Sequence, residues 1–276
     1  MENYDKVSIL MSVYFKEDPE NFKSCLQSMV DQTLKADEIV LVKDGPLTNE
    51  LEAVIDEYAK KYEDLLKVVT LDQNVGLGEA LNIGIQKCSN QLIARMDTDD
   101  IAVADRIEKQ ASYLALHPET AIVGSDIIEF ETSIDNVIAH RIVPHTHDEI
   151  ISFASRRNPF NHMTVMYRKD AVLQAGNYLP INGYEDYYLW VRMLKAGVRA
   201  HNLSEVLVYA RAGYDMYYRR GGWKYLLDGF KALNQIYEVG LMSKKDFTIR
   251  LVGQIVVNSV PNKLRGFFYT NFLRKK

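Results

Sequence analysis

The sequence predicts an α/β fold: an open, twisted, mostly parallel sheet flanked by helices, followed by a C-terminal amphipathic helical extension. Four short β-branched or aliphatic runs, at residues 7–14, 38–42, 66–71 and 91–96, alternate with helical patterns and are typical of repeated βαβ units. Polar residues follow each run, where the loops of a parallel sheet gather. After about Lys244 the alternation is gone, and two helical patterns are separated at Pro261.

The first two helical patterns each carry one apolar stripe. Asp18-Pro19 is a typical helix start, because proline fits the first turn of a helix. Apolar residues then recur at helical spacing, which predicts that one face of each helix packs on the sheet. The stripes are Phe22, Cys25, Leu26, Met29 and Val30 in the first helix, and Leu51, Val54, Ile55 and Tyr58 in the second.

The composition is that of an ordinary soluble globular chain with a sizeable core: 276 residues, 47% hydrophobic, 25% charged and a formal net charge of -4. Cys25 and Cys88 lie in apolar helical patterns with no CxxC pair, which favours free thiols in a reducing compartment. The first six residues are polar, and no uncharged run reaches the roughly 18 residues of a membrane-spanning helix. We therefore expect a cytoplasmic protein.

Three carboxylates follow the fourth predicted strand within four residues, in the segment Met96-Asp97-Thr98-Asp99-Asp100. A strand that ends in such a cluster aims several hard oxygen ligands at one point, which suits a Mg²⁺ or Mn²⁺ that also holds a diphosphate. The alternative is that these acids only begin the next helix, predicted over residues 105–117. One aspartate would satisfy that need.

The other strand ends carry polar loops that would lie at the same edge of the sheet, where ligands bind in open parallel sheets. Asp44-Gly45 after the second strand is by itself a turn signal. Residues 74–78, Asn-Val-Gly-Leu-Gly, are called the glycine loop; they precede a helix and could bind phosphate through backbone N–H groups. They contain neither GxGxxG nor a Walker lysine-serine pair, which disfavours a Rossmann dehydrogenase and a P-loop NTPase.

The order of these motifs resembles that of the family 2 glycosyltransferases of GT-A fold. The resemblance rests on Asp44, the glycine loop and residues 97–100, and it continues through residues 158–168 and the Glu185-Asp186 pair within residues 183–190. It covers roughly residues 7–225 and is closest to single-sugar transferases of bacterial capsule, O-antigen and exopolysaccharide assembly. It implies a GT-A domain over residues 1–242.

The resemblance implies a donor site at the strand ends. Asp44 matches the position that contacts the nucleotide base, with uracil or thymine as its partner, and Asp97 matches the acid near the ribose and diphosphate. Asp99, with Asp97, matches the ligands of the Mg²⁺ or Mn²⁺, whereas Asp100 is expected to cap the following helix. Further donor-nucleotide residues are expected at Val13, Tyr14, Asn74 and Gly76, and on the diphosphate at Arg219 and Arg220.

The resemblance also implies a catalytic base. Asp186 matches the residue that takes the proton of the acceptor hydroxyl, with Glu185 as the alternative or an acceptor-side partner. These two acids are also typical of the first turn of a helix, and a helix start and a catalytic role can hold together. His162 and Trp223 are candidate acceptor contacts, with a buried histidine and a half-buried helix aromatic as the alternatives.

The implied reaction is a single displacement at the sugar C1 with inversion of configuration. Arg219-Arg220 departs from the Gln-x-x-Arg-Trp motif of processive members, which favours transfer of one sugar per acceptor. The implied partners are a nucleotide-sugar donor, UDP- or dTDP-linked, and a hydroxyl of a polyprenyl-diphosphate-linked glycan at the cytoplasmic face of the membrane.

Residues 243–276 form a basic amphipathic extension with a net charge of +7, against -11 for the remainder of the chain. Lysines and arginines flank its apolar stripe, which suits peripheral contact with the anionic inner face of the plasma membrane. The alternative is packing on its own domain or in a homodimer. A nucleic-acid partner is disfavoured, because the remainder of the chain is acidic. The stripe is Leu264, Phe267, Phe268 and Phe272.

Two rival functions remain at this stage. A sugar-phosphate nucleotidyltransferase shares a nucleotide-binding parallel sheet, but it usually carries a glycine-rich basic loop after the first strand, and residues 14–18 contain no glycine. A non-catalytic sugar-nucleotide-binding scaffold is disfavoured because both Asp99 and Asp186 are present.

Overall fold

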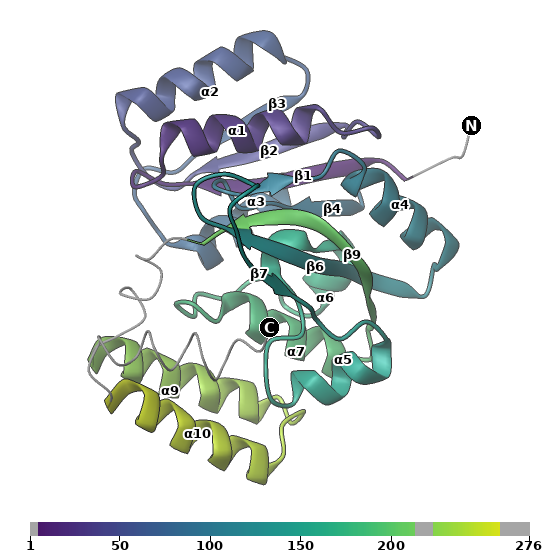
Figure 1. The fold of residues 1–276 in the computed structure, drawn as a ribbon, viewed down its shortest axis with the longest axis vertical. Coiled ribbons are helices and arrows are strands. Elements are labelled where there is room, and N and C mark those ends of the chain that lie inside the picture. Colours follow the sequence, from purple (N-terminus) through teal and green to yellow (C-terminus); the bar gives the residue numbers. More distant parts are fainter. Residues whose placement is uncertain (1–4, 213–222, 260–276) are drawn as a thin grey trace.

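The structure, a computed structural model, describes residues 5–212 and 223–259 (Figure 1). Within these residues the strands form one mixed sheet of order β3-β2-β1-β4-β8-β6-β9-β5, and β7 pairs with β6 outside that path. Helices cover both faces of this curled sheet (Figure 1). The predicted α/β class is confirmed.

The parallel half of the sheet follows the predicted βαβ pattern. β2 and β4 both pair in parallel with β1, and β3 pairs in parallel with β2, so their carboxyl ends lie at one edge. The strands are β1 (Val7–Val13), β2 (Glu38–Lys43), β3 (Leu66–Thr70) and β4 (Leu92–Arg95). The helices between them are α1 (Pro19–Val30), α2 (Asn49–Lys61) and α3 (Leu77–Lys87).

The other half is mixed, and its strands were not located from the sequence. β8 is antiparallel to both β4 and β6, whereas β6 and β9 are parallel, and β5 pairs with the far end of β9. The strands are β5 (Ile101–Ala102), β6 (Thr120–Phe130), β7 (Val137–Arg141), β8 (Met166–Arg168) and β9 (Arg199–Arg211). The helices are α4 (Arg106–Leu116), α5 (His147–Ala154), η1 (His162–Thr164), α6 (Lys169–Gln174), α7 (Glu185–Lys195), α9 (Trp223–Glu238) and α10 (Lys244–Ser259).

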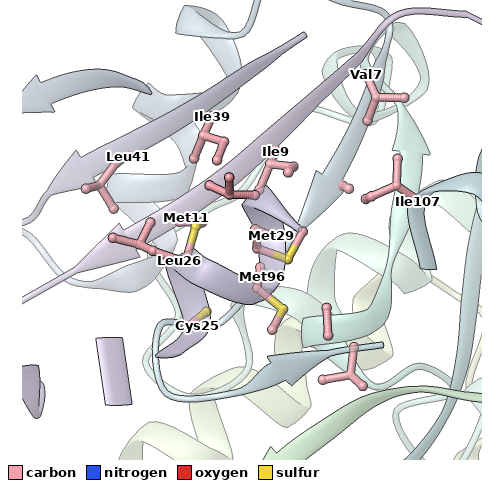
Figure 2. Packing of buried hydrophobic residues seen from close by; sticks show 14 of the residues in the cluster. Val7, Ile9, Met11, Cys25, Leu26, Met29, Ile39, Leu41, Met96 and Ile107 are labelled. Carbon is pink, nitrogen blue, oxygen red and sulfur yellow. The ribbon is translucent and has the colours of Figure 1, made fainter. Parts of the chain in front are cut away.

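Local sequence explains where α1 begins and which face it buries. The Asp18 carboxylate accepts hydrogen bonds from the backbone N–H groups of Glu20 and Asn21, both at 3.0 Å, and Pro19 occupies the first turn. The predicted stripe is buried, and Figure 2 shows Leu26 and Met29 of α1 beside side chains of the sheet. Each such side chain contributes roughly 1.5–3 kcal/mol on burial.

Strand alternation assigns side chains to two separate cores. Ile9 on β1 faces the core shared with α1, α2 and α4, whereas Leu10 faces the core shared with α3 and α7. On β4, Ala94 faces the first core and Ile93 the second. Arg95, the last residue of β4, lies two residues after Ile93. Its side chain therefore points to the same face of the sheet, toward α7.

The two C-terminal helices that the structure describes pack on α7. Phe247 and Leu251 of α10 lie against a cluster that includes Tyr187 of α7 and Ile236 of α9. Arg250 of α10 donates a hydrogen bond to the Tyr187 hydroxyl at 3.0 Å. The predicted boundary at residues 242/243 stays a prediction, and the Leu264–Phe272 stripe lies outside the described residues. Among the described helices, none combines the length and the apolar character that crossing a membrane requires.

Candidate active site

The acidic loop, residues 96–100, follows β4 and is held in place by a buried arginine side chain. Arg95, with 1% of its side chain exposed, forms an ion pair with Asp97, whose side chain is 30% exposed. The backbone oxygen of Asp97 also accepts the Cys25 thiol at 3.0 Å. The Asp97 carboxylate is therefore held in one orientation while part of it faces solvent.

Asp99 lies among other carboxylates. Burial, together with the negative charges of Asp97 and Glu17, raises its pKa to about 7. Glu17, from the loop after β1, accepts the Thr98 hydroxyl at 2.6 Å. The sequence reasoning missed Glu17, although its position just beyond a strand end was the available signal. A divalent cation would relieve this repulsion, although no three His, Cys, Asp or Glu side chains gather into a metal site within residues 5–212 and 223–259.

Asp100 does not cap the next helix, contrary to the expectation. Asp105 occupies the N-cap of α4, and the Asp100 carboxylate instead accepts the backbone N–H of Arg211 at 2.7 Å. The Arg211 side chain donates to the backbone oxygen of Asp99 at 3.1 Å. The reason is that β5 begins directly after Asp100 and pairs with β9, which brings Arg211 to the acidic loop. Sequence reasoning also missed Arg211.

A second buried arginine lies beneath the loop. Arg106 of α4 is fully buried and donates to the backbone oxygen of Arg95 at 2.6 Å and to the Gln110 side chain at 3.0 Å. Gln110 in turn donates to the backbone oxygen of Thr164 at 2.7 Å. Burial lowers the pKa of Arg106 to about 9. This polar network fixes the base of the acidic loop to two neighbouring segments.

Asp44 organises the glycine loop. Its carboxylate accepts hydrogen bonds from the backbone N–H of Val75 at 2.7 Å, from that of Gly76 at 3.1 Å and from the Asn74 side chain at 2.9 Å. Gly45 permits this approach: it has φ +86°, and a Cβ there would lie 2.5 Å from the backbone nitrogen of Asn74. Asp44 itself is only 3% exposed. The start of α3 is thus tied to the end of β2.

The Glu185-Asp186 pair lies at the first turn of α7, as predicted. Asp186 is half-buried and accepts the Asn158 side chain and the backbone N–H of Tyr187, both at 2.6 Å. Burial raises the pKa of Asp186, while these hydrogen bonds and the charges of Arg95 and Arg141 oppose the shift. Burial, followed by the charge of Asp186, raises the pKa of Glu185 to about 7.

The two carboxylates of α7 face different neighbours. Glu185 lines a cavity of about 120 Å³ together with residues 75–79 of the glycine loop and residues 180–183. Gly78 makes this contact possible, because a Cβ there would lie 3.1 Å from the Glu185 Cβ and 3.0 Å from the Leu179 backbone oxygen. Asp186 lies toward Asn158 instead.

Arg95 connects the acidic loop with α7. Its positive charge partly opposes the rise in the pKa of both Glu185 and Asp186, and its pairing with Asp97 raises its own pKa. The Nε and Nη1 groups of Arg95 have no hydrogen-bond partner within residues 5–212 and 223–259. No sequence prediction included Arg95, although β4 alternation directs it toward α7.

The remaining predicted residues divide into three groups. His162 donates to or accepts from the Tyr178 hydroxyl at 2.8 Å and packs edge-on against Trp190, the arrangement expected of a buried histidine. Val13 is buried at the end of β1 and Tyr14 is half-buried beside it. Arg219 and Arg220 lie outside the described residues, as does the side chain of Trp223, the first residue of α9.

Comparison with known proteins places this site in a family. The family model described as glycosyl transferase family 2 matches residues 8–174. The chain belongs to glycosyltransferase family 2. It is 42% identical over 266 residues to the amylovoran biosynthesis glycosyltransferase AmsE of Erwinia amylovora, which covers 95% of this chain and 97% of that protein.

Two further likenesses support the family and its fold. The chain is 34% identical over 270 residues to an Escherichia coli UDP-Gal:alpha-D-GlcNAc-diphosphoundecaprenol beta-1,3-galactosyltransferase, covering 98% of this chain and 97% of that one. The structure matches a mannosyltransferase of Pyrobaculum calidifontis in complex with GDP-Man and Mn²⁺, with a TM-score of 0.67 at 14% identity. That match covers 96% of this chain and 72% of the other. The family 2 chain is therefore a glycosyltransferase of GT-A fold, which removes the nucleotidyltransferase and scaffold alternatives.

Proposed function

We propose that this family 2 enzyme is an inverting, divalent-metal-dependent transferase of cell-surface polysaccharide biosynthesis, which moves one sugar from a UDP- or dTDP-linked donor to a hydroxyl of a lipid-linked glycan. The observation that carries the proposal is the position of Arg95. It pairs with Asp97 in the acidic loop, and its charge acts on Asp186 at the start of α7. These interactions of Arg95 support placing the carboxylates assigned to the donor and to the acceptor in one site.

On the donor side, Asp99 and Asp97 would hold Mg²⁺ or Mn²⁺, which supplies charge neutralisation for the diphosphate leaving group. The crowded carboxylates around Asp99 support this assignment. We assign the nucleotide to the strand ends beside Asp44, with the base next to the loop that Asp44 organises. Val13, Tyr14, Asn74, Gly76, Arg219 and Arg220 complete the proposed donor site.

On the acceptor side, Asp186 takes the proton of the attacking hydroxyl. The acceptor oxygen forms a bond to the sugar C1 as the bond from C1 to the diphosphate oxygen breaks, and the configuration at C1 inverts. Asp186 is preferred to Glu185 because it is the less buried of the two, and because Asn158 and Tyr187 donate to its ionised form. Trp223 remains a proposed acceptor contact, whereas the contacts of His162 with Tyr178 and Trp190 favour the alternative of a buried histidine.

The lipid-linked acceptor is supported by the acceptor for which the Escherichia coli relative is named, a sugar on diphosphoundecaprenol. We further propose peripheral contact with the cytoplasmic face of the membrane. Exposed apolar side chains on the two C-terminal helices support it: Leu227 of α9 is 53% exposed, and Ile249 and Val252 of α10 are 58% and 53% exposed. If the full chain and a chain ending before Ser243 sediment equally with anionic liposomes, a role of residues 243–276 in this contact is ruled out; if neither sediments, the contact as a whole is ruled out.

The test begins with a donor panel. We expect release of UDP or dTDP from one sugar nucleotide, in the presence of Mn²⁺ or Mg²⁺ and a lipid-diphosphate-linked sugar acceptor. Anomeric proton couplings of the product, measured by NMR, report the configuration at C1. Retention of configuration, or full activity in chelator, would overturn the corresponding part of the proposal.

Variants then separate binding from chemistry. Asp99→Ala should lose metal-dependent nucleotide binding, measured by calorimetry, while circular dichroism shows an intact fold. Asp186→Asn should keep nucleotide binding and lose transfer by roughly two to four orders of magnitude, the range for a positioned general base. Asp72→Asn, at an exposed acid near the glycine loop, is the matched control. An inactive Glu185→Gln beside an active Asp186→Asn would move the base to Glu185.

A further inference from the structure

A second cavity lies outside the site described above. It has a volume of about 940 Å³ and is formed by two segments, residues 142–145 after β7 and one face of α5 with its C-terminal extension. This volume is within the range of pockets that bind small molecules. The lining residues of the second segment are spaced as on one helix face: Asp148, Glu149, Ser152, Phe153, Arg156 and Arg157.

Both lining segments lead directly to the proposed catalytic base. Arg157 is followed by Asn158, which donates to the Asp186 carboxylate at 2.6 Å. Ile142 is preceded by Arg141, whose positive charge partly opposes the rise in the pKa of Asp186. Each lining segment is therefore continuous in the chain with a residue that acts on Asp186, and Asn158 brings the Arg157 end of the cavity near that carboxylate.

Charge is distributed unevenly along the cavity. Its acidic residues, Asp148 and Glu149, lie in the first turn of α5, and the Glu149 carboxylate is already engaged in a capping box with Thr146. Its basic residues, Arg156 and Arg157, lie at the opposite end of the helix face, next to Asn158. The end nearest to Asp186 is thus the basic end, which suits an anionic group close to the reacting hydroxyl.

Apolar side chains accompany the two arginines. Ile142 is 64% exposed, and the Arg157 guanidinium lies over the Phe153 ring at 5.8 Å from its centroid. Arg156 forms an ion pair with Asp246 of α10 at 3.3 Å, so the basic end of the cavity adjoins the helix with exposed Ile249. The cavity combines guanidinium groups, which match phosphate oxygens, with an apolar wall.

We infer that this cavity binds the isoprenoid diphosphate of the acceptor, with Arg157 and Arg156 on the diphosphate and Ile142 and Phe153 against the first part of the lipid. The inference rests on the proposed lipid-linked acceptor and adds the site that recognises it. The sugar of such an acceptor lies between the basic end of the cavity and Asp186. The diphosphate of the acceptor then lies apart from the diphosphate of the donor, which is assigned to the acidic loop.

The experiment measures binding of farnesyl diphosphate to the full chain by calorimetry, below its micelle concentration and with UDP and Mn²⁺ saturating the donor site. Farnesol and inorganic diphosphate are the comparison ligands. We expect farnesyl diphosphate to bind most tightly. Arg157→Ala should weaken it by roughly ten- to a hundredfold, the range of a charge-assisted contact, and Arg157→Lys should weaken it less.

Matched variants divide the site into its two parts. Ile142→Ser should weaken farnesyl diphosphate but not inorganic diphosphate, and Arg199→Ala, an exposed arginine at the start of β9, should change neither. Unchanged affinity of farnesyl diphosphate in Arg157→Ala overturns the inference. Inorganic diphosphate that binds as tightly as farnesyl diphosphate also overturns it, because the cavity would then recognise free phosphate. UDP binding, measured separately in every variant, reports on the fold and on the proposed donor site, so a failure there is distinguishable.

Discussion

Replacing Asp44 with alanine should destabilise the protein and loosen the glycine loop. Three donors converge on this carboxylate, at 2.7 Å, 2.9 Å and 3.1 Å, and two of them are backbone N–H groups at the start of α3. A hydrogen bond to a charged group contributes about 1.5–3 kcal/mol, and three that share one acceptor are not additive. Because the loop can partly rehydrate, we expect a loss of about 2–4 kcal/mol.

The assay is thermal unfolding followed by circular dichroism, together with calorimetric titration of the nucleotide. A loss of this size lowers the Tm by roughly 5–10 °C in a chain of this length. Nucleotide affinity should also fall, since the loop that Asp44 holds adjoins the proposed donor site. Asp72→Ala removes the same charge from an exposed position and should leave both quantities unchanged. An Asp44→Ala variant with the parental Tm would refute the reasoning, because the three hydrogen bonds would then contribute nothing.

Three further predictions concern the neighbouring elements. Arg95→Met should move the acid limb of the pH–rate profile to higher pH, because the Arg95 charge lowers the pKa of Asp186; Arg95→Lys should move it less. The pKa of Glu185 is raised from 4.5 to about 7, so the folded state binds this proton more tightly than the unfolded chain does. The free energy of unfolding should therefore fall by about 3 kcal/mol as the pH rises from 4.5 to 7. Urea unfolding at pH 5 and pH 8 should show that the Glu185→Gln variant has lost this part of the pH dependence of stability. Gly84→Ala places a Cβ 2.5 Å from Leu10 Cδ1 and should lower stability by about 1–2 kcal/mol in urea unfolding, since overpacking outweighs the gain in helix propensity.

Local periodicity was sufficient for the first half of the fold. The predicted runs at residues 7–14, 38–42, 66–71 and 91–96 each became a strand of the parallel sheet, with no end displaced by more than one residue. The reason is that strands buried on both faces are continuous apolar runs, which the sequence shows directly. The acidic loop and the Glu185-Asp186 helix start were also predictable, because each depends on neighbouring residues.

The second half depends on pairings that leave no local signal. β8 has three residues and lies antiparallel between β4 and β6, and this insertion brings residues 158–168 beside the acidic loop. Asp100 illustrates the consequence: its neighbours in the chain suggest a helix cap, but its partner is Arg211 on β9. A hydrogen bond across more than one hundred residues cannot be inferred from residue type alone.

The sequence by itself determined the chemical groups of this protein: the carboxylates at 97, 99 and 186, the glycine loop and the family to which they point. The tertiary structure decided which of those groups share an environment, and it added Glu17, Arg95 and Arg211 to them. The physical reason is that a side chain's charge state and orientation depend on burial and on nearby charges, and these come from segments distant in the chain. The turn of Arg95 toward α7, which links the acidic loop to Asp186, exists only because the sheet folds as it does.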